Sequence, residues 1–235
     1  MTPDRTCTLI TGGASGIGLA AARRFAAGGH ALLLVDQNAE SLDAAVQALP
    51  LGTQVLTCAA KVTDPEAVKD CVAQAVARFG GIDGLVTSAG IVKVAASLDV
   101  TPEDFRAQMD VNVAGSWFFA QATAKDLVRP GRPGSIVMIG SVYGASGAPM
   151  RAAYCASKGA IHNLTEALAV EWGPLGIRVN TVAPTGVRTP MVQALMDAGT
   201  YNTAGGSKPA LRSDGWRNRK RSPTPAGSSR QRRLP

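Results

Sequence analysis

Short apolar runs alternate with longer amphipathic segments along the first 199 residues of this 235-residue chain. The runs are rich in Val, Ile and Leu and predict strands at residues 8–10, 31–35, 54–58, 82–87, 135–139 and 178–183. Helical spacing predicts helices that end near residues 28, 48, 79, 128 and 172. Because the strands lack apolar–polar alternation, we expect an α/β, doubly wound, Rossmann-like parallel sheet with helices on both faces.

The starts of two helices carry recognisable capping sequences. Thr63-Asp-Pro-Glu66 has the form of a capping box, in which the Thr63 hydroxyl and the Glu66 carboxylate bond free backbone N–H groups. Thr101, followed by Pro-Glu-Asp, opens a long helical region that reaches about Val128. Since ligands of such sheets bind at the carboxyl ends of the strands, candidate residues are sought there.

A glycine-rich turn, Thr11-Gly-Gly-Ala-Ser-Gly-Ile-Gly18, joins the first strand to the first helix. Glycines permit a tight turn, and the helix N-terminus presents free N–H groups and a positive dipole end to a pyrophosphate. The spacing differs from the common G-x-G-x-x-G fingerprint, and turns use glycine for conformational reasons alone. By itself the turn is therefore weak evidence for a nucleotide site.

Asp36 strengthens the nucleotide interpretation. It ends the second predicted strand, about 20 residues beyond the turn, where a carboxylate accepts hydrogen bonds from an adenosine ribose and repels a 2′-phosphate. Its neighbour is Gln37, not Arg or Lys. The pattern favours NAD(H) over NADP(H); the alternative is a solvated aspartate at a strand end.

Tyr154 and Lys158 are candidates for acid–base chemistry. Their spacing of four residues places both side chains on one face of a predicted helix. A nearby cation stabilises a phenolate and lowers the tyrosine pKa from about 10, which would let Tyr154 exchange a proton with an alcohol or carbonyl oxygen near neutral pH. Taken alone, such a pair is more often a coincidental surface arrangement.

Two polar residues lie where they would assist this pair. Ser141 ends the strand before the helix, and its hydroxyl would bond the same substrate oxygen. Asn112 lies inside an otherwise apolar helical stretch, where a buried amide needs hydrogen-bond partners. A satisfied core asparagine is the alternative interpretation of Asn112.

With these residues in order, the sequence resembles the short-chain dehydrogenase/reductase family over about residues 5–196. The glycine turn has the family's TGxxxGxG form, Ser88-Ala-Gly90 resembles the end of its NNAG motif, and Arg178-Val-Asn-Thr-Val-Ala-Pro184 resembles its post-catalytic strand. The four residues that match the family's catalytic set are Asn112, Ser141, Tyr154 and Lys158.

The resemblance implies a role for each matched residue. Tyr154 is the general acid/base, Lys158 lowers its pKa and bonds the nicotinamide ribose, Ser141 holds the substrate oxygen, and Asn112 maintains a water-linked proton relay. Hydride passes between the nicotinamide and the substrate carbon. The implied cofactor-binding residues are Gly12, Ser15, Gly16, Ile17, Gly18, Asp36, Val62, Ser88, Ala89, Gly90, Tyr154, Lys158, Pro184, Val187 and Thr189.

The chain departs from the family pattern at several places. Thr87 and Ser88 replace the two asparagines of NNAG, and Lys61 replaces an aspartate that approaches the adenine amine, so the Val62 backbone is expected to contact adenine. The glycine of Pro184-Thr185-Gly186 comes one position late. The family's last strand is not recognisable, so strand six is expected to form an exposed edge. The homodimer or homotetramer usual in the family is therefore doubtful here.

The positive charge changes the interpretation of the C-terminal segment. The chain carries a net charge of +7, but residues 200–235 hold nine Lys or Arg and one Asp, so residues 1–199 are near neutral. Those 36 residues include 13 Gly, Pro or Ser, a composition typical of disorder. We expect an NAD(P)-binding catalytic domain at 1–199 and a basic tail at 200–235. The abrupt change favours an out-of-frame reading of the gene over an evolved nucleic-acid or membrane arm.

The remaining composition narrows the class. No run approaches the roughly 20 apolar residues of a membrane span, and no secretory signal is visible. Four cysteines without a CxxC pair and two isolated histidines argue against zinc and for reduced thiols. We expect a cytoplasmic protein with no metal and with neither nucleic acid nor membrane as a partner.

The sequence therefore predicts an NAD(H)-dependent oxidoreductase that interconverts a secondary alcohol and a ketone, with a small molecule as substrate. One alternative is a 3-oxoacyl-[acyl-carrier-protein] reductase-like enzyme, which usually prefers NADPH and is disfavoured by Asp36. Another is a catalytically impaired nucleotide-binding or interaction protein that lacks the C-terminal strand.

Overall fold

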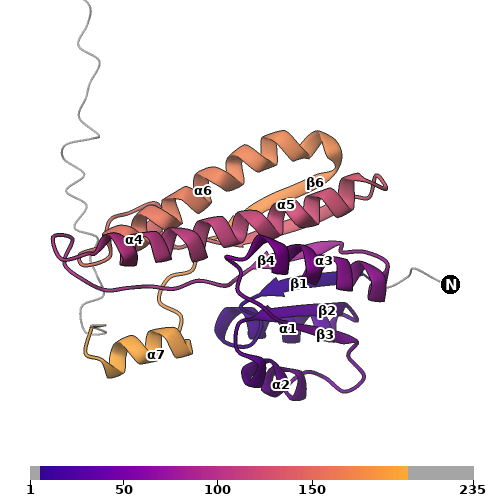
Figure 1. Ribbon diagram of the computed structural model, residues 1–235, viewed down its shortest axis with the longest axis horizontal. Helices are drawn as coiled ribbons and strands as arrows, with labels where there is room; N and C mark the ends of the chain where they lie inside the picture. The colour runs from indigo at the N-terminus through magenta and orange to yellow at the C-terminus, as the bar shows by residue number, and fades with distance from the viewer. Residues whose placement is uncertain (1–5, 201–235) are drawn as a thin grey trace, which may run out of the picture.

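A six-stranded parallel sheet with the order β3-β2-β1-β4-β5-β6 forms the centre of the computed structural model, which describes residues 6–200 (Figure 1). Its strands are β1 (Cys7–Thr11), β2 (Ala31–Asp36), β3 (Val55–Ala59), β4 (Gly84–Thr87), β5 (Gly134–Ile139) and β6 (Ile177–Val182). The order reverses between β2 and β4 on either side of β1, which confirms the doubly wound topology. The two halves of the sheet diverge from β1, so the carboxyl ends of β1 and β4 flank a crevice.

Helices connect the strands and cover the sheet. They are α1 (Gly16–Ala27), α2 (Ala39–Gln47), α3 (Pro65–Phe79), α4 (Pro102–Met109), α5 (Gly115–Val128), α6 (Ala152–Trp172) and α7 (Pro190–Asp197). Three short helical turns lie between these elements: the π-helical turn η1 (Asp110–Ala114) and the 3₁₀ turns η2 (Val142–Gly144) and η3 (Gly173–Leu175). Within residues 6–200, none of the helices is long and apolar enough to cross a membrane. The tail expected at 200–235 lies, apart from Thr200, outside the described residues.

Side chains of neighbouring strand positions enter two separate cores. Leu9 and Leu33 pack with α3, α5 and α6 on one face, whereas Ile10, Leu32 and Leu34 pack with α1 and α2 on the other. Figure 1 shows α5 and α6 side by side on one side of the sheet, with α1 and α2 on the opposite side. Each fully buried aliphatic side chain of this kind contributes about 1.5–3 kcal/mol, which explains the continuous apolar runs of the central strands.

The edge strand β6 has a different pattern. Ile177 and Val179 are buried, while Arg178 and Asn180 between them are exposed. In the described part of the chain β6 pairs with β5 alone. The strand is therefore covered by α6 on one face and is open on the other.

The local structure differs from the sequence prediction at three places. Asp64, not Thr63, caps α3, because the helix begins at Pro65 and the Asp64 carboxylate accepts hydrogen bonds from the N–H groups of Glu66 and Ala67. The helix expected over 101–128 is interrupted by a π-helical turn at η1. The helix α7 was not predicted, although Thr189 before Pro190 has the form of an N-cap.

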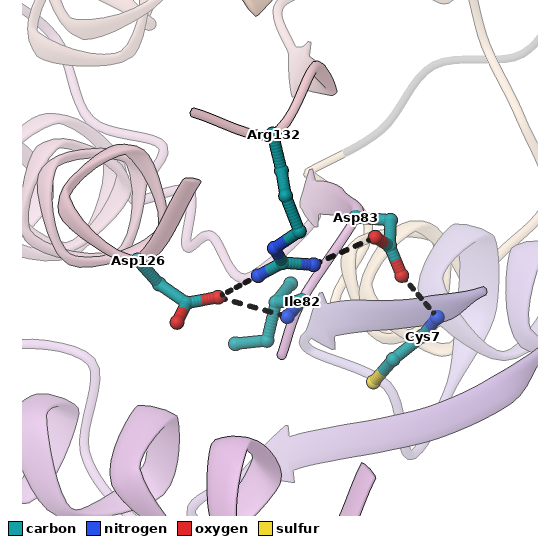
Figure 2. A network of polar contacts seen from close by, with 5 residues as sticks. All are labelled: Cys7, Ile82, Asp83, Asp126 and Arg132. Atoms are coloured by element: carbon teal, nitrogen blue, oxygen red, sulfur yellow. Dashed lines mark hydrogen bonds and ion pairs between the residues drawn. The ribbon is translucent and has the colours of Figure 1, made fainter. Parts of the chain in front are cut away.

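An ion-pair network fastens the amino ends of three strands (Figure 2). The Arg132 guanidinium, just before β5, lies 2.8 Å from Asp83 Oδ1 and 2.7 Å from Asp126 Oδ2. The other oxygen of Asp83 accepts a hydrogen bond from the Cys7 N–H, and Asp126 Oδ2 also accepts one from the Ile82 N–H. Each carboxylate thus joins a backbone donor of the sheet to one shared cation.

The Cys7 side chain beside this network is fully buried. Burial, followed by the negative charge of Asp83, raises the pKa of the Cys7 thiol to about 12. The thiol is therefore uncharged at physiological pH. The four cysteines are all free thiols, as the sequence predicts.

We expect Arg132→Ala to lower the free energy of unfolding by about 2 kcal/mol, since hydrogen bonds to charged groups contribute about 1.5–3 kcal/mol and the carboxylates keep part of their solvation. The matched control is Lys69→Ala, whose ion pair with Glu66 is 66% and 78% exposed and contributes at most about 0.5 kcal/mol. Urea unfolding followed by circular dichroism measures both. Equal losses in the two variants would contradict a stabilising role for the Arg132 network.

Candidate active site

The glycine turn after β1 brings two backbone segments closer than any side chain allows. Gly12 has φ 64°, and a Cβ on it would lie 2.7 Å from the Ala89 backbone N at the end of β4. A Cβ on Gly18 would overlap the Gly12 carbonyl oxygen. Both positions therefore require glycine for close approach, and only Gly12 also requires it for conformation.

The N-terminus of α1 faces the same space without a local anion. Its N-cap residue, Ser15, makes no side-chain capping bond, and the first turn contains no acidic residue. Ser15, Gly16 and Ile17 line a cavity of about 470 Å³ at the carboxyl ends of the strands. The free N–H groups and the helix dipole together suit an anionic group such as a pyrophosphate.

Almost every residue predicted from the sequence lines this cavity. Of the predicted set, only Gly18, which packs against the turn, and Asn112, which lies behind the wall, are not part of the lining. The predicted residues that do line it are Gly12, Ser15, Gly16, Ile17, Asp36, Val62, Ser88, Ala89, Gly90, Ser141, Tyr154, Lys158, Pro184, Val187 and Thr189.

Asp36 marks one end of the cavity. Its backbone carbonyl accepts a hydrogen bond of 2.9 Å from the Ala60 N–H, and its Oδ1 accepts one of 3.2 Å from the Asn38 N–H. Gln37, Lys61 and Val62 line the cavity beside it. The Asp36 carboxylate thus lies at the carboxyl end of β2. Lys61, which replaces an aspartate of the family pattern, adds a positive charge to the lining at this end of the cavity.

Lys158 and Tyr154 mark the other end. The Lys158 Nζ donates a hydrogen bond of 2.7 Å to the Ile139 carbonyl at the end of β5 and lies 5.7 Å from the Tyr154 ring centroid. The Lys158 side chain is almost fully buried, and burial lowers the pKa of its ammonium to about 8. Lys158 is therefore charged at neutral pH, but only narrowly.

The pKa of Tyr154 differs from the expectation. In the chain itself, burial raises the pKa of the phenol above its ordinary value, and this effect exceeds the lowering by a hydrogen bond with Ser141 and by the positive charge of Arg151. The prediction of a lowered pKa took the Lys158 charge into account but not the desolvation of the phenolate. Ser141 is nevertheless placed as predicted, within hydrogen-bond reach of Tyr154.

Asn112 lies in the π-helical turn η1 and joins two parts of the site. Its Oδ1 accepts a hydrogen bond of 2.8 Å from the Ile91 N–H, and its Nδ2 donates to the Ile91 carbonyl and to Ser157 Oγ, each at 3.0 Å. The amide is therefore fully partnered, which agrees with the satisfied-core alternative. These bonds fix the loop after β4 against the α6 segment between Tyr154 and Lys158.

Several contributors to the site were not foreseen. The Ile139 carbonyl receives the Lys158 ammonium, and a backbone acceptor leaves no residue signature. Thr11 Oγ1 accepts a hydrogen bond from the Ala89 N–H, which joins the ends of β1 and β4. By contrast, the buried Thr87 hydroxyl, in place of the first family asparagine, has no hydrogen-bond partner among the described residues.

The residues present fit a dinucleotide. A Cβ on Gly90 would approach Asn112 Oδ1 at 3.2 Å and Lys158 Nζ at 3.8 Å, so the glycine leaves room between the turn and the reactive end. Asp36 offers acceptors for a ribose, the α1 N-terminus offers donors for a pyrophosphate, and Lys158 and Tyr154 flank the opposite end. The three features occur along one cavity in the order of the parts of such a molecule.

Comparison with known proteins places this geometry in a family. The model of the short chain dehydrogenase family matches residues 6–199. Galactitol 2-dehydrogenase (L-tagatose-forming) from Cereibacter sphaeroides is 41% identical over 80% of this chain and 74% of its own length. The 2,5-dichloro-2,5-cyclohexadiene-1,4-diol dehydrogenase of Sphingobium indicum is 38% identical over 80% of this chain and 75% of its own.

Solved structures agree with the sequence comparison. A short chain dehydrogenase from Mycobacterium paratuberculosis bound to NAD has a TM-score of 0.78 and 34% identity, covering 82% of this chain and 78% of that one. An ElxO variant with NADPH bound has a TM-score of 0.77 and 29% identity, covering 84% and 80%. The family match and these relatives show that the chain belongs to the short-chain dehydrogenase/reductase family, as an NAD(P)-dependent oxidoreductase that acts on CH–OH groups of small molecules.

Proposed function

We propose that the chain interconverts a secondary alcohol and a ketone with NAD(H), using Ser141, Tyr154 and Lys158 at the reactive end of the cavity. The observation that carries this proposal is the placement of the buried Lys158 ammonium beside the Tyr154 ring, in the cavity that also holds Asp36 and the glycine turn. A proton-transfer group and a dinucleotide cradle thus share one space.

The side chains divide the chemistry among them. Ser141 donates a hydrogen bond to the substrate oxygen and holds it against the Tyr154 hydroxyl. Tyr154 gives its proton to that oxygen during reduction and takes it back during oxidation. A bound nicotinamide supplies or accepts the hydride. The Lys158 charge stabilises the phenolate left on Tyr154, against the burial that raises its pKa.

Asn112 supports the reaction from behind the wall. Its bonds to Ile91 and Ser157 hold the helix that carries Tyr154 and Lys158 against the end of β4. We assign it a positioning role, because every polar atom of its amide already has a partner in the protein. The site then requires no movement of Asn112 during turnover.

The substrate proposal draws on the relatives. Galactitol 2-dehydrogenase and the cyclohexadiene-diol dehydrogenase are both named for oxidation at a ring or chain carbon that bears a secondary hydroxyl. Within the described residues, the cavity lining includes the apolar residues Ile91, Val187 and Met191 and no acidic side chain besides Asp36. We therefore propose uncharged secondary alcohols and ketones, and the test is NAD(H)-linked turnover of a panel of both by the purified chain.

Asp36 carries the proposed preference for NAD(H). Its carboxylate stands where an adenosine ribose would lie, and a 2′-phosphate there would meet a like charge. Lys61 lines the same end but makes no ion pair with Asp36 within the described residues, so the negative charge is not neutralised locally. The cofactor preference then depends on a single side chain.

We expect Tyr154→Phe to lower kcat by about 10²–10⁴-fold, because it removes the proton donor while leaving the ring in place. Binding of NADH, followed by its fluorescence, should stay within a few-fold of the parent value, and the unfolding midpoint should be unchanged. Turnover at the parent rate would refute Tyr154 as the acid/base.

We expect Asp36→Ala to reduce the preference for NAD(H) over NADP(H) by roughly 10–100-fold, which corresponds to the loss of about 1.5–3 kcal/mol from hydrogen bonds to a charged group. Asp43→Ala is the matched control, since Asp43 is exposed on α2 and its loss changes the net charge equally. The ratio of kcat/KM values for the two cofactors is the measurement. A shift of the same size in both variants would show that the effect is long-range and not a ribose contact.

We expect Lys158→Met to be inactive and to abolish a pH dependence of stability. Because the pKa of Lys158 is about 8 in the folded chain and the ordinary pKa of a lysine is 10.5, the unfolded chain binds more protons between these two pH values. The parent therefore gains stability as pH rises from about 8 to 10.5, on the order of 3 kcal/mol, relative to the variant. Urea unfolding of both proteins across this range tests the sign. Parallel curves would contradict a buried ammonium at residue 158.

A further inference from the structure

His162 lies one helical turn beyond Lys158 on α6 and reaches the segment that carries Ser141. A Cβ on Gly140 would be 2.5 Å from His162 Nε2, and a Cβ on Gly144 would be 2.6 Å from its Cε1. Both distances are shorter than real contacts to a Cβ. The imidazole ring therefore occupies space that is left open by Gly140, just before Ser141, and by Gly144, three residues after it.

The His162 ring contributes to this segment by the volume that it fills more than by hydrogen bonding. Its Nε2 is buried and has no hydrogen-bond partner among the described residues. A buried polar atom without a partner costs about 1–3 kcal/mol, and an apolar side chain at this position would avoid that cost. Hydrogen bonding by Nε2 therefore gives no reason for a histidine at position 162. The fit of the ring against Gly140 and Gly144 does give one.

The Ser141 segment is also held by β6 and the loop after it. The Gly140 N–H donates to the Val182 carbonyl at 2.8 Å, and the Val142 N–H donates to the Pro184 carbonyl at 3.2 Å. The Thr181 methyl group also lies where a Cβ on Gly140 would point. Because the His162 ring packs against Gly140 and Gly144 and these two hydrogen bonds hold Gly140 and Val142, the backbone before and after Ser141 has little freedom to shift.

We propose that His162 is a positioning residue for Ser141: its ring supports the backbone at Gly140 and Gly144 and thereby sets the distance between the Ser141 hydroxyl and Tyr154. The inference rests on the proposed function, since it assigns Ser141 a place in the reaction. His162 itself is not among the residues that line the cavity. Its effect on rate arises because a displacement of about 1 Å in a catalytic group costs roughly 10²-fold.

The first test compares two substitutions at one position. His162→Ala empties the space beneath the segment and should lower kcat by roughly 10–100-fold. His162→Met keeps a similar volume without ring nitrogens and should keep kcat within about threefold of the parent, because methionine adapts to irregular gaps. Equal losses in both variants would overturn the proposal, since they would show that the nitrogens and not the volume matter.

Further readouts separate positioning from general damage. The Kd for NADH and the pH profile of kcat should be unchanged in His162→Ala, because neither the cofactor cavity nor the titratable and charged groups around Tyr154 (Lys158, Arg151, Tyr143 and Cys155) are altered. His30→Ala is the control for loss of a histidine. His30 contacts Phe25 and Thr8 at the amino end of β2, whereas the cavity lies at the carboxyl ends of the strands. A fall in NADH affinity matching the fall in kcat would overturn a specific effect on Ser141.

The second test is a double-mutant cycle with Gly140→Ala. In the parent the new methyl group meets His162 and should lower kcat by roughly 10²-fold; in the His162→Ala background the loss should be only a few-fold, with the Thr181 methyl as the remaining obstacle. The same cycle is measured on the free energy of unfolding. Additive losses in both measurements would overturn the contact.

Measuring both kcat and the free energy of unfolding also separates the role of His162 from the proposed function. A parent chain that binds NADH but turns over no alcohol or ketone would contradict the proposed function. Coupling between residues 140 and 162 in the unfolding free energy would then still support the packing of His162 beneath the Ser141 segment. Coupling in kcat as well supports the full proposal.

Discussion

The candidate site depends on one ammonium group that is kept charged in a buried place. Lys158 Nζ is almost fully buried, and within residues 6–200 its hydrogen-bond acceptor is the Ile139 carbonyl, at 2.7 Å. This bond fastens α6 to the end of β5 and places a positive charge beside Tyr154. Since the same burial raises the pKa of Tyr154 and lowers that of Lys158, the environment works against both charged forms. In the proposed function, the charged forms of Lys158 and Tyr154 that the reaction uses are therefore the forms that burial disfavours.

The Arg132 ion-pair network and the candidate site lie at opposite ends of the strands. The Arg132 network joins the amino ends of β1, β4 and β5, where no residue of the cavity is found. The carboxyl ends of the same strands carry the glycine turn, the Ala89 contact and the Ile139 carbonyl. A parallel sheet makes this separation available because all of its strands end on one side. Among residues 6–200, the buried side-chain polar atoms without a hydrogen-bond partner belong to Thr87, Thr123 and His162.

Much of this arrangement could be predicted from the sequence, and the exceptions have physical causes. Apolar runs located all six strands within about two residues, because burial on both faces demands them. The residues lining the cavity followed from strand ends and the family resemblance. The π-turn at Asn112 escaped prediction because its apolar spacing resembles that of an α-helix. The Tyr154 pKa and the role of His162 depend on burial and on contacts with glycines, which no local pattern records.

The central position of β1 has a consequence for the order in which the cleft is built. Each later strand is added outward from a pair already formed, first toward β3 and then toward β6. The glycine turn, Asp36 and Gly90 are all synthesised before Ser141, Tyr154 and Lys158. In a chain that folds as it is synthesised, the part of the cavity formed by the glycine turn, Asp36 and Gly90 would therefore be complete before the part that holds Tyr154 and Lys158.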